Sequence, residues 1–188
     1  MPHKFGHNWS GLLRPERAQA QPPDAILALV APQPGETVLD LGSGPGYVSL
    51  PLAERVGATG RVIAADIAEE PLALLRTAAA AMPQVRTVLV EESRLPLPDA
   101  SVDAALLVNV LHELADPVGS LGELRRVLRA GGRLGIVDWD PASPGRGPRI
   151  EERVPPERAG QWLRAAGFVP EPAAALGAAF YAVRATVG

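Results

Sequence analysis

Three glycines and a proline occupy four of the five positions from Gly42 to Gly46, between the apolar segments "TVLDL" and "YVSLPLA". Such a stretch brings the main chain to the end of a strand without bulky side chains, so that a ligand can approach the backbone itself. A helix that begins near Tyr47 would also present its N–H groups to an anionic ligand. The stretch therefore predicts a ligand-binding loop at the carboxyl edge of a parallel sheet.

The spacing of these glycines distinguishes two kinds of nucleotide-binding loop. In the dinucleotide fingerprint G-x-G-x-x-G, the third glycine allows the helix to pack closely on the strand. Here the pattern is G-x-G-x-G, and Tyr47 stands where that third glycine belongs. A tyrosine would obstruct the close packing, so the spacing disfavours an NAD-binding loop.

Two carboxylates accompany the predicted loop. Asp40 comes just before the first glycine, and Asp66 ends the segment "VIAAD", twenty residues after Gly46. A carboxylate accepts two hydrogen bonds from a vicinal diol, and nucleotide-binding folds place an acid at this distance on the ribose. Asp66 is therefore a candidate ribose ligand, with a surface acid as the alternative. Asp40 is expected to brace the loop, to contact the ligand, or to do both.

A further apolar segment lies in "SVDAALLVNVLHEL". Asn109 is at its end, and His112 follows three residues later. The unperturbed pKa of histidine, about 6.5, suits a general base. The pattern "LHEL" is equally typical of a helix start whose histidine packs against a loop. His3 and His7 stand four residues apart but lack neighbouring carboxylates, so we expect solvated histidines and no metal site.

Apolar, β-branched segments alternate with helical segments along the chain, which is typical of βα units on a parallel sheet. The strand-like segments are 37–41, 61–66, 85–90, 102–109 and 133–138. They are apolar on both faces, as expected where helices cover a sheet on both sides. Residues 178–185 alternate like a strand without a following helix, and a short turn at Gly177 would join two strands that end the sheet as an antiparallel pair. We therefore expect an α/β fold with a doubly wound, mostly parallel sheet.

Glycine and proline mark the helix ends in this pattern. Gly57 and the glycines of "LRAGGR" are expected to cap the helices that precede two of the strands. The pair Pro155 and Pro156 predicts the start of the last helix, because proline fits the first turn.

Length and composition indicate the class of protein. The chain has 188 residues, of which 47% are apolar, and we expect a single domain with an N-terminal extension over 1–34 and a core over 35–188. The absence of cysteine excludes disulfides and thiolate metal sites.

The net charge is −3, and acidic and basic residues are interspersed along the chain. The sequence therefore lacks the basic surface of a nucleic-acid-binding protein, which favours a small-molecule partner. Without a long apolar run or an apolar leader pattern, we expect a cytoplasmic protein with no membrane span.

Five stretches resemble class I S-adenosylmethionine-dependent methyltransferases. The segment "VLDLGSGPGYVSLPLA" is similar to the first motif of this family, in which an acidic residue precedes G-x-G-x-G. The other four follow in the family's order: "VIAADI", "EESRLPLPDASVDAALLVNVLHELADP", "RRVLRAGGRLGIVDWD" and "PERAGQWLRAAGF". The match covers residues 35–185 and is most similar to small-molecule enzymes of the ubiquinone and menaquinone methyltransferase type. It implies a Rossmann-like sheet of seven strands with the last strand antiparallel.

The resemblance implies that the chain binds S-adenosylmethionine, methylates a small molecule and releases S-adenosylhomocysteine. The implied cofactor contacts are Asp40, Gly42, Ser43, Gly44, Gly46, Asp66, Ile67, Glu91, Glu92, Ser93 and Asn109. The acidic or polar residue that meets the adenine is one of the three from Glu91 to Ser93. His112 would lie near the transferred methyl group and act as a base where the acceptor is a phenol or an enol.

Two other functions remain compatible with the sequence. A methyltransferase-like domain that binds the cofactor or a partner protein without catalysis is favoured by the short chain, which has no large inserted substrate lid. An NAD(P)-dependent oxidoreductase is disfavoured by the glycine spacing and by the lack of a recognisable Tyr–Lys pair. Binding of S-adenosylmethionine or of NADH would separate these classes. The oligomeric state is not indicated.

Overall fold

The computed structural model describes all residues except 1–8, 10–14, 92–93 and 144–146. Its strands are β1 (Thr37–Leu41), β2 (Arg61–Asp66), β3 (Val85–Leu89), β4 (Val102–Val108), β5 (Leu128–Trp139), β6 (Phe168–Pro170), β7 (Ala174–Leu176) and β8 (Phe180–Val187). The helices are α1 (Pro15–Ala20), α2 (Pro23–Leu27), α3 (Ser49–Val56), α4 (Glu69–Ala78), α5 (Pro117–Val127) and α6 (Pro156–Ala165), with short 3-10 turns η2 (Leu111–Glu113) and η3 (Ile150–Glu152).

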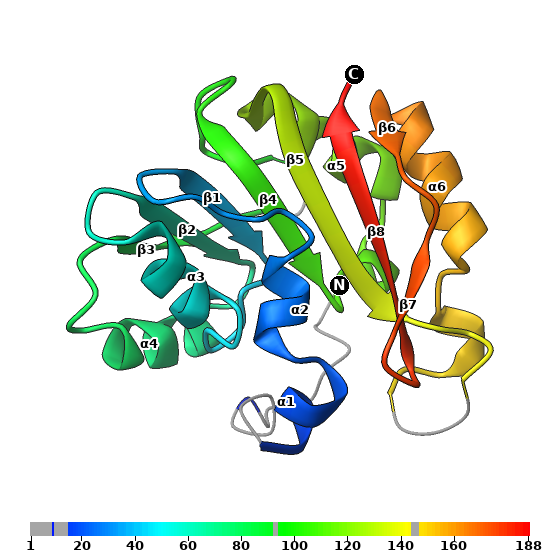
Figure 1. Cartoon of the computed structure of the whole chain (residues 1–188), viewed down its shortest axis with the longest axis horizontal. Helices are drawn as coiled ribbons and strands as arrows, with labels where there is room; N and C mark the ends of the chain where they lie inside the picture. Colours follow the sequence, from blue (N-terminus) through cyan, green and yellow to red (C-terminus); the bar gives the residue numbers. More distant parts are fainter. Residues whose placement is uncertain (1–8, 10–14, 92–93, 144–146) are drawn as a thin grey trace.

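The described strands form one sheet in the order β3-β2-β1-β4-β5-β8-β6, with β7 paired to β8 (Figure 1). The strands from β1 to β5 pair in parallel, and β8 runs antiparallel to β5, β6 and β7. This confirms the doubly wound, mostly parallel sheet and its antiparallel last strand. The described sheet has eight strands where the family pattern implies seven, because the short β7 turns back onto β8 at Gly177.

Two apolar layers cover the sheet, because successive strand residues point to opposite faces. On one face, α2 and α3 belong to the same apolar cluster as Val38 and Val62. On the other face, α5 and α6 belong to the cluster that includes Leu39 and Ile63 (Figure 1). The predicted covering of both faces fails at β3. This strand lies at the edge of the sheet, where Leu89 is 55% exposed.

The helix ends agree with the prediction at Gly57 and at Pro156 and differ in "LRAGGR". The N–H of Gly57, at a φ of 66°, donates to the carbonyl of Ala53 and closes α3. In contrast, α5 ends at Val127 and the chain enters β5 at once, so that Gly131, at a φ of 71°, lies in a bulge between β5 and β4. The fifth strand therefore begins five residues earlier than predicted, at Leu128.

The N-terminal segment packs on the sheet through α2. Ile26, Leu27 and Val30 are at most 1% exposed and belong to the same apolar cluster as Val38. The turn that follows α1 thereby lies at the carboxyl ends of β1 and β4, below their arrowheads in Figure 1. No helix in the described part of the chain is long and apolar enough to cross a membrane.

Candidate functional site

The glycine stretch forms a tight loop between β1 and α3. Gly42, Gly44 and Gly46 have φ angles of 75°, 52° and 100°, a region that side chains with a Cβ rarely adopt. A Cβ at Gly42 would overlap a methyl group of Val110, and one at Gly46 would overlap Leu75 of α4. Gly42 and Gly46 are therefore required both by the backbone conformation and by close packing, and Gly44 by its backbone conformation.

Asp66, at the end of β2, clamps this loop. Its Oδ2 accepts the N–H of Gly44 at 2.8 Å, and its Oδ1 accepts the N–H of Ala68 at 3.0 Å. The side chain is 6% exposed, and each carboxylate oxygen can accept more than one hydrogen bond. The carboxylate thus fixes the position of the loop and keeps the capacity to accept from a ligand hydroxyl.

Ser43 contributes a polar atom without a partner at the same place. Its backbone N–H donates to the carbonyl of Ala65 at 3.0 Å, and the residue is 6% exposed. Its buried hydroxyl has no hydrogen-bond partner in the part of the chain that the structure describes. Buried hydroxyls are normally satisfied, so this one indicates a place where a ligand supplies the partner.

Asp40 lies under the loop and is 1% exposed. Its Oδ2 accepts the hydroxyl of Ser49, the first residue of α3, at 2.6 Å. Burial raises the pKa of the Asp40 carboxyl from 3.8 to about 6, although Ser49 and the nearby Arg17 favour the charged form. The structure thus shows the bracing role that the sequence left open, and it adds a buried carboxylate that a nearby cation would stabilise.

Asn109 follows β4 directly and has a strained backbone conformation. Its φ is 61°, which asparagine tolerates better than most residues, and its N–H donates to the carbonyl of Val137 at 2.8 Å. The side chain exchanges two hydrogen bonds with Gln21, from Gln21 Nε2 to Asn109 Oδ1 at 2.9 Å and from Asn109 Nδ2 to Gln21 Oε1 at 3.0 Å. This amide pair ties the segment after β4 to the N-terminal segment.

The sequence did not indicate Gln21 as a site residue, nor its contacts with Tyr47 and Arg17. The hydroxyl of Tyr47 donates to the carbonyl of Gln21 at 2.6 Å, and the guanidinium of Arg17 lies 4.0 Å from the centre of the Tyr47 ring. No local pattern connects Gln21 with Asn109, which are 88 residues apart. The one usable signal was Tyr47, whose place after the last glycine puts an aromatic ring at the loop.

The remaining predicted cofactor residues lie at the ends of β2 and β3. Ile67 is 44% exposed, which is unusual for a large apolar side chain and suits contact with a flat ring. Glu91 is exposed and forms an isolated bridge with Arg94. Glu92 and Ser93 lie outside the described residues, as do His3 and His7.

His112 forms a buried pair with Asp138 at the end of β5. Its Nδ1 lies 2.7 Å from Asp138 Oδ1, and its backbone N–H donates to Asp138 Oδ2 at 3.0 Å. Both side chains have no exposed surface, and Nε2 lies 3.8 Å from a carboxylate oxygen of Glu113. The pairing fixes the orientation of the ring, as the carboxylate of a catalytic triad does for its histidine. It also joins η2 to β5, which is the packing role that the sequence offered, whereas the role as a base stays a prediction.

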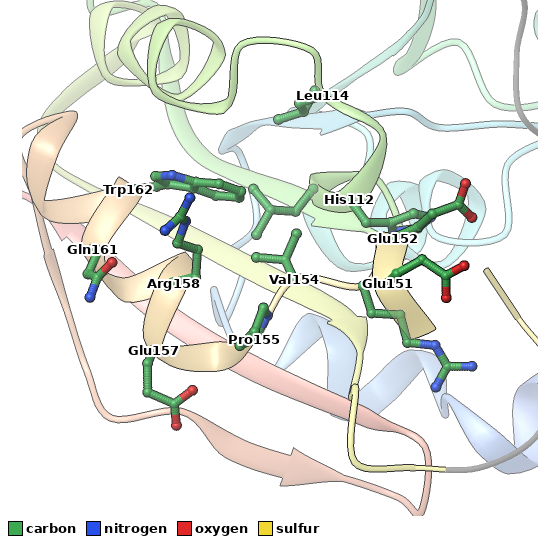
Figure 2. Close-up of a pocket in the computed structure, with 12 residues that line it drawn as sticks. His112, Leu114, Glu151, Glu152, Val154, Pro155, Glu157, Arg158, Gln161 and Trp162 are labelled. Atoms are coloured by element: carbon green, nitrogen blue, oxygen red, sulfur yellow. The ribbon is translucent and has the colours of Figure 1, made fainter. Parts of the chain in front are cut away.

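A pocket of about 530 Å³ lies beside this pair, between η2, the segment around η3 and the start of α6 (Figure 2). Leu114, Val154 and Trp162 supply apolar walls, and the carboxylates of Glu151 and Glu157 lie at its outer side. The volume is in the range of small-molecule sites. Val110 packs against Gly42, and His112, two residues later, lines this pocket. The same short segment after β4 therefore borders both the glycine loop and the pocket.

The chain matches the sequence profile of a family described as a methyltransferase domain over residues 39–136. Over 119 residues it is 44% identical to an uncharacterized methyltransferase of Mycobacterium tuberculosis, covering 63% of this chain and 45% of that protein. Over 110 residues it is 40% identical to a 2-phytyl-1,4-naphtoquinone methyltransferase of Trichormus variabilis, covering 57% and 48%. The chain thus spans less than half the length of these two curated relatives.

A solved structure of another protein is similar over 98% of the chain. It is a SAM-dependent methyltransferase from Aquifex aeolicus with 30% sequence identity and a TM-score of 0.93. The similarity covers 98% of this chain and 100% of that one, so it includes the N-terminal segment as well as the sheet.

Proposed function

Because the chain belongs to the methyltransferase domain family of class I S-adenosylmethionine-dependent enzymes, we propose that it methylates a small-molecule acceptor with S-adenosylmethionine as the donor. The observation that carries this proposal is the glycine loop, which is held in a left-handed conformation and clamped by Asp66. We propose that residues 1–188 act as one domain and that residues 1–34 cover the donor site.

The residues around the loop suit this donor. Asp66 would accept hydrogen bonds from the ribose hydroxyls, and Ile67 would contact the adenine, beside one of the residues from Glu91 to Ser93. The loop from Gly42 to Gly46 would let the methionine portion approach the backbone, and the hydroxyl of Ser43 would find its missing partner there. Asp40 and Asn109 would face the cationic part of the donor.

Methyl transfer from a sulfonium is an in-line displacement, in which the donor itself supplies the electrophilic carbon. The chain must therefore hold the acceptor's nucleophile about 3 to 3.5 Å from that carbon and in line with the breaking bond, which can lower the barrier by about 7 to 11 kcal/mol. A dry pocket assists, because positive charge is dispersed and not created in this reaction.

The pocket beside His112 is the proposed acceptor site. Its volume of about 530 Å³ and its apolar walls suit a compact, partly apolar molecule. We propose that His112, oriented by Asp138, removes the proton of a phenol or enol acceptor during transfer. Since the imidazole has no exposed surface, the acceptor must displace the residues that cover it when it binds.

The proposal is tested with S-adenosylmethionine that carries a labelled methyl group. The purified chain is incubated with a panel of phenols, enols, amines and thiols, and label is sought in the extracted acceptors. Transfer to at least one acceptor is expected. Binding of S-adenosylhomocysteine without transfer to any acceptor would favour a non-catalytic domain, and binding of NADH alone would favour an oxidoreductase. The cytoplasmic location belongs to the proposal too and is tested by fractionation of the source cells.

A further inference from the structure

Tyr181 carries a buried hydroxyl to which the proposed reaction gives no role. The residue belongs to β8, is 2% exposed and is part of the apolar cluster on the α5 and α6 face of the sheet. Its hydroxyl has no hydrogen-bond partner among the residues that the structure describes. A buried hydroxyl without a partner destabilises a fold, and a phenylalanine would fill the same space without that cost. The hydroxyl therefore indicates a partner that the described part of the chain does not supply.

Tyr181 lies next to the pair formed by His112 and Asp138. It is directly opposite Asp138 in the antiparallel ladder of β5 and β8, so both side chains point to the same face of the sheet. Asp138 accepts hydrogen bonds from the backbone N–H groups of His112 and Trp139 and lies 2.7 Å from His112 Nδ1. The phenol ring is thus adjacent to the pair, but its hydroxyl is not bonded to it.

The acceptor pocket and the surroundings of Tyr181 share residues. Leu111 and Val154 line the pocket and belong to the same buried cluster as Tyr181. Leu114 and Trp162 also line the pocket and pack against that cluster (Figure 2). Tyr181 therefore lies behind the apolar wall of the pocket.

Three carboxylates influence the hydroxyl of Tyr181. Burial raises the pKa of this phenol. The negative charges of Asp138, Asp140 and Glu157 raise the pKa further, so the phenol stays protonated and can donate a hydrogen bond. The same charges oppose a further anion at this place. A neutral oxygen of a ligand would therefore be a better partner than a carboxylate.

We propose that the hydroxyl of Tyr181 donates a hydrogen bond to a neutral oxygen of the bound acceptor. The pocket then prefers phenols or enols that also carry a carbonyl group and disfavours those that carry a carboxylate. Since Val154 belongs both to the pocket wall and to the cluster around Tyr181, the displacement that admits the acceptor to His112 also uncovers this hydroxyl. The inference rests on the proposed acceptor site and adds a residue that selects the acceptor.

The test uses three phenols of nearly equal size that differ in one substituent. Para-hydroxyacetophenone carries a carbonyl group, para-isopropylphenol has a methyl group in place of the carbonyl oxygen, and para-hydroxybenzoate carries a carboxylate. Ligand-observed NMR titration of the full chain, saturated with S-adenosylhomocysteine, gives their dissociation constants. The unchanged chain should bind para-hydroxyacetophenone more tightly than para-hydroxybenzoate.

Tyr181→Phe removes only the hydroxyl. Its affinity for para-hydroxyacetophenone should fall by about 3- to 10-fold, the range expected for one hydrogen bond between neutral groups. Its affinity for para-isopropylphenol should stay the same or rise. Comparing each ligand between the two proteins cancels the difference in hydration between the ligands.

Thermal unfolding without ligand separates this contact from a structural role. Tyr181→Phe should unfold at the same temperature as the unchanged chain or higher, because it removes a buried hydroxyl without a partner. Tyr47→Phe is the matched control for stability, since the hydroxyl of the other tyrosine donates to the carbonyl of Gln21 at 2.6 Å. Its removal should lower the unfolding temperature.

The outcomes distinguish the inference from the proposed function. Equal changes in affinity for para-hydroxyacetophenone and para-isopropylphenol in Tyr181→Phe, or no change for either, would overturn the inference. A loss of stability in Tyr181→Phe as large as that in Tyr47→Phe would also overturn it, because the hydroxyl would then be bonded within the fold, for instance to a buried water. Failure of all three phenols to bind would overturn the inference and leave the donor in place. Failure of the chain to bind S-adenosylhomocysteine would instead refute the proposed function.

Discussion

Replacing Asp40 by asparagine tests whether the glycine loop rests on a buried carboxylate that is costly to ionise. The pKa of Asp40 is raised by burial from 3.8 to about 6. A shift of about 2 pKa units corresponds to about 3 kcal/mol, since each unit is about 1.36 kcal/mol. Because the folded pKa is the higher one, the carboxyl stabilises the fold below its unfolded pKa, and this contribution is lost as the pH rises through 6.

The side-chain amide of the Asp40→Asn variant does not titrate. The free energy of unfolding of this variant minus that of the unchanged chain should therefore rise by about 2 to 3 kcal/mol as the pH goes from 4 to 8. The variant thus gains stability relative to the unchanged chain. Any constant cost of the amide, such as a poorer partner for Ser49, cancels in this difference between two pH values. Urea unfolding without ligand, followed by tryptophan fluorescence from pH 4 to pH 8, measures it.

The same substitution should weaken the binding of S-adenosylmethionine above pH 6, since we propose that the buried carboxylate faces the cationic part of the donor. A variant that is more stable at pH 8 and binds the donor less tightly would show that Asp40 is retained for binding. A difference in unfolding free energy that stays constant over the pH range would refute the reasoning, because the carboxyl would then titrate alike in the folded and unfolded chains.

Three other substitutions probe the loop and the pocket. Gly46→Ala should destabilise the chain by about 2 to 4 kcal/mol and weaken S-adenosylhomocysteine binding, whereas Gly57→Ala, with a φ of 66° but open space around it, should lower thermal stability alone. Asp66→Asn should lower the affinity for S-adenosylhomocysteine at least about tenfold in a calorimetric titration, since an amide N–H would face a backbone N–H. Unchanged affinity would argue against a contact between Asp66 and the ribose. His112→Asn should reduce kcat for a phenol or enol acceptor about 10²- to 10⁴-fold with unchanged S-adenosylhomocysteine binding, and Glu113→Gln serves as its control; equal kcat losses in both would contradict a base at His112.

The apolar segments predicted the sheet well because burial on both faces leaves a direct mark on the sequence. The ranges 37–41 and 61–66 coincide with β1 and β2. The pattern was less informative for β3, whose edge position is set by the topology and not by its own residues. It also missed the early start of β5, because a bulge at Gly131 resembles a helix cap in sequence.

The site was predictable where it depends on local backbone conformation and not where it depends on tertiary contacts. The positive φ angles at Gly42 and Gly46 follow from the glycine pattern. The pairing of His112 with Asp138, and that of Asn109 with Gln21, join segments whose proximity only the fold creates. The sequence could therefore name His112 and Asn109 as candidates without identifying their partners.

Calorimetric titration of the purified chain with S-adenosylhomocysteine tests the central claim most directly. The account predicts saturable binding of one ligand per chain and a ligand-dependent rise in the thermal unfolding temperature, both weakened by Asp66→Asn. Absence of binding heat and of any thermal shift at millimolar ligand, in a chain shown to be folded, would contradict it.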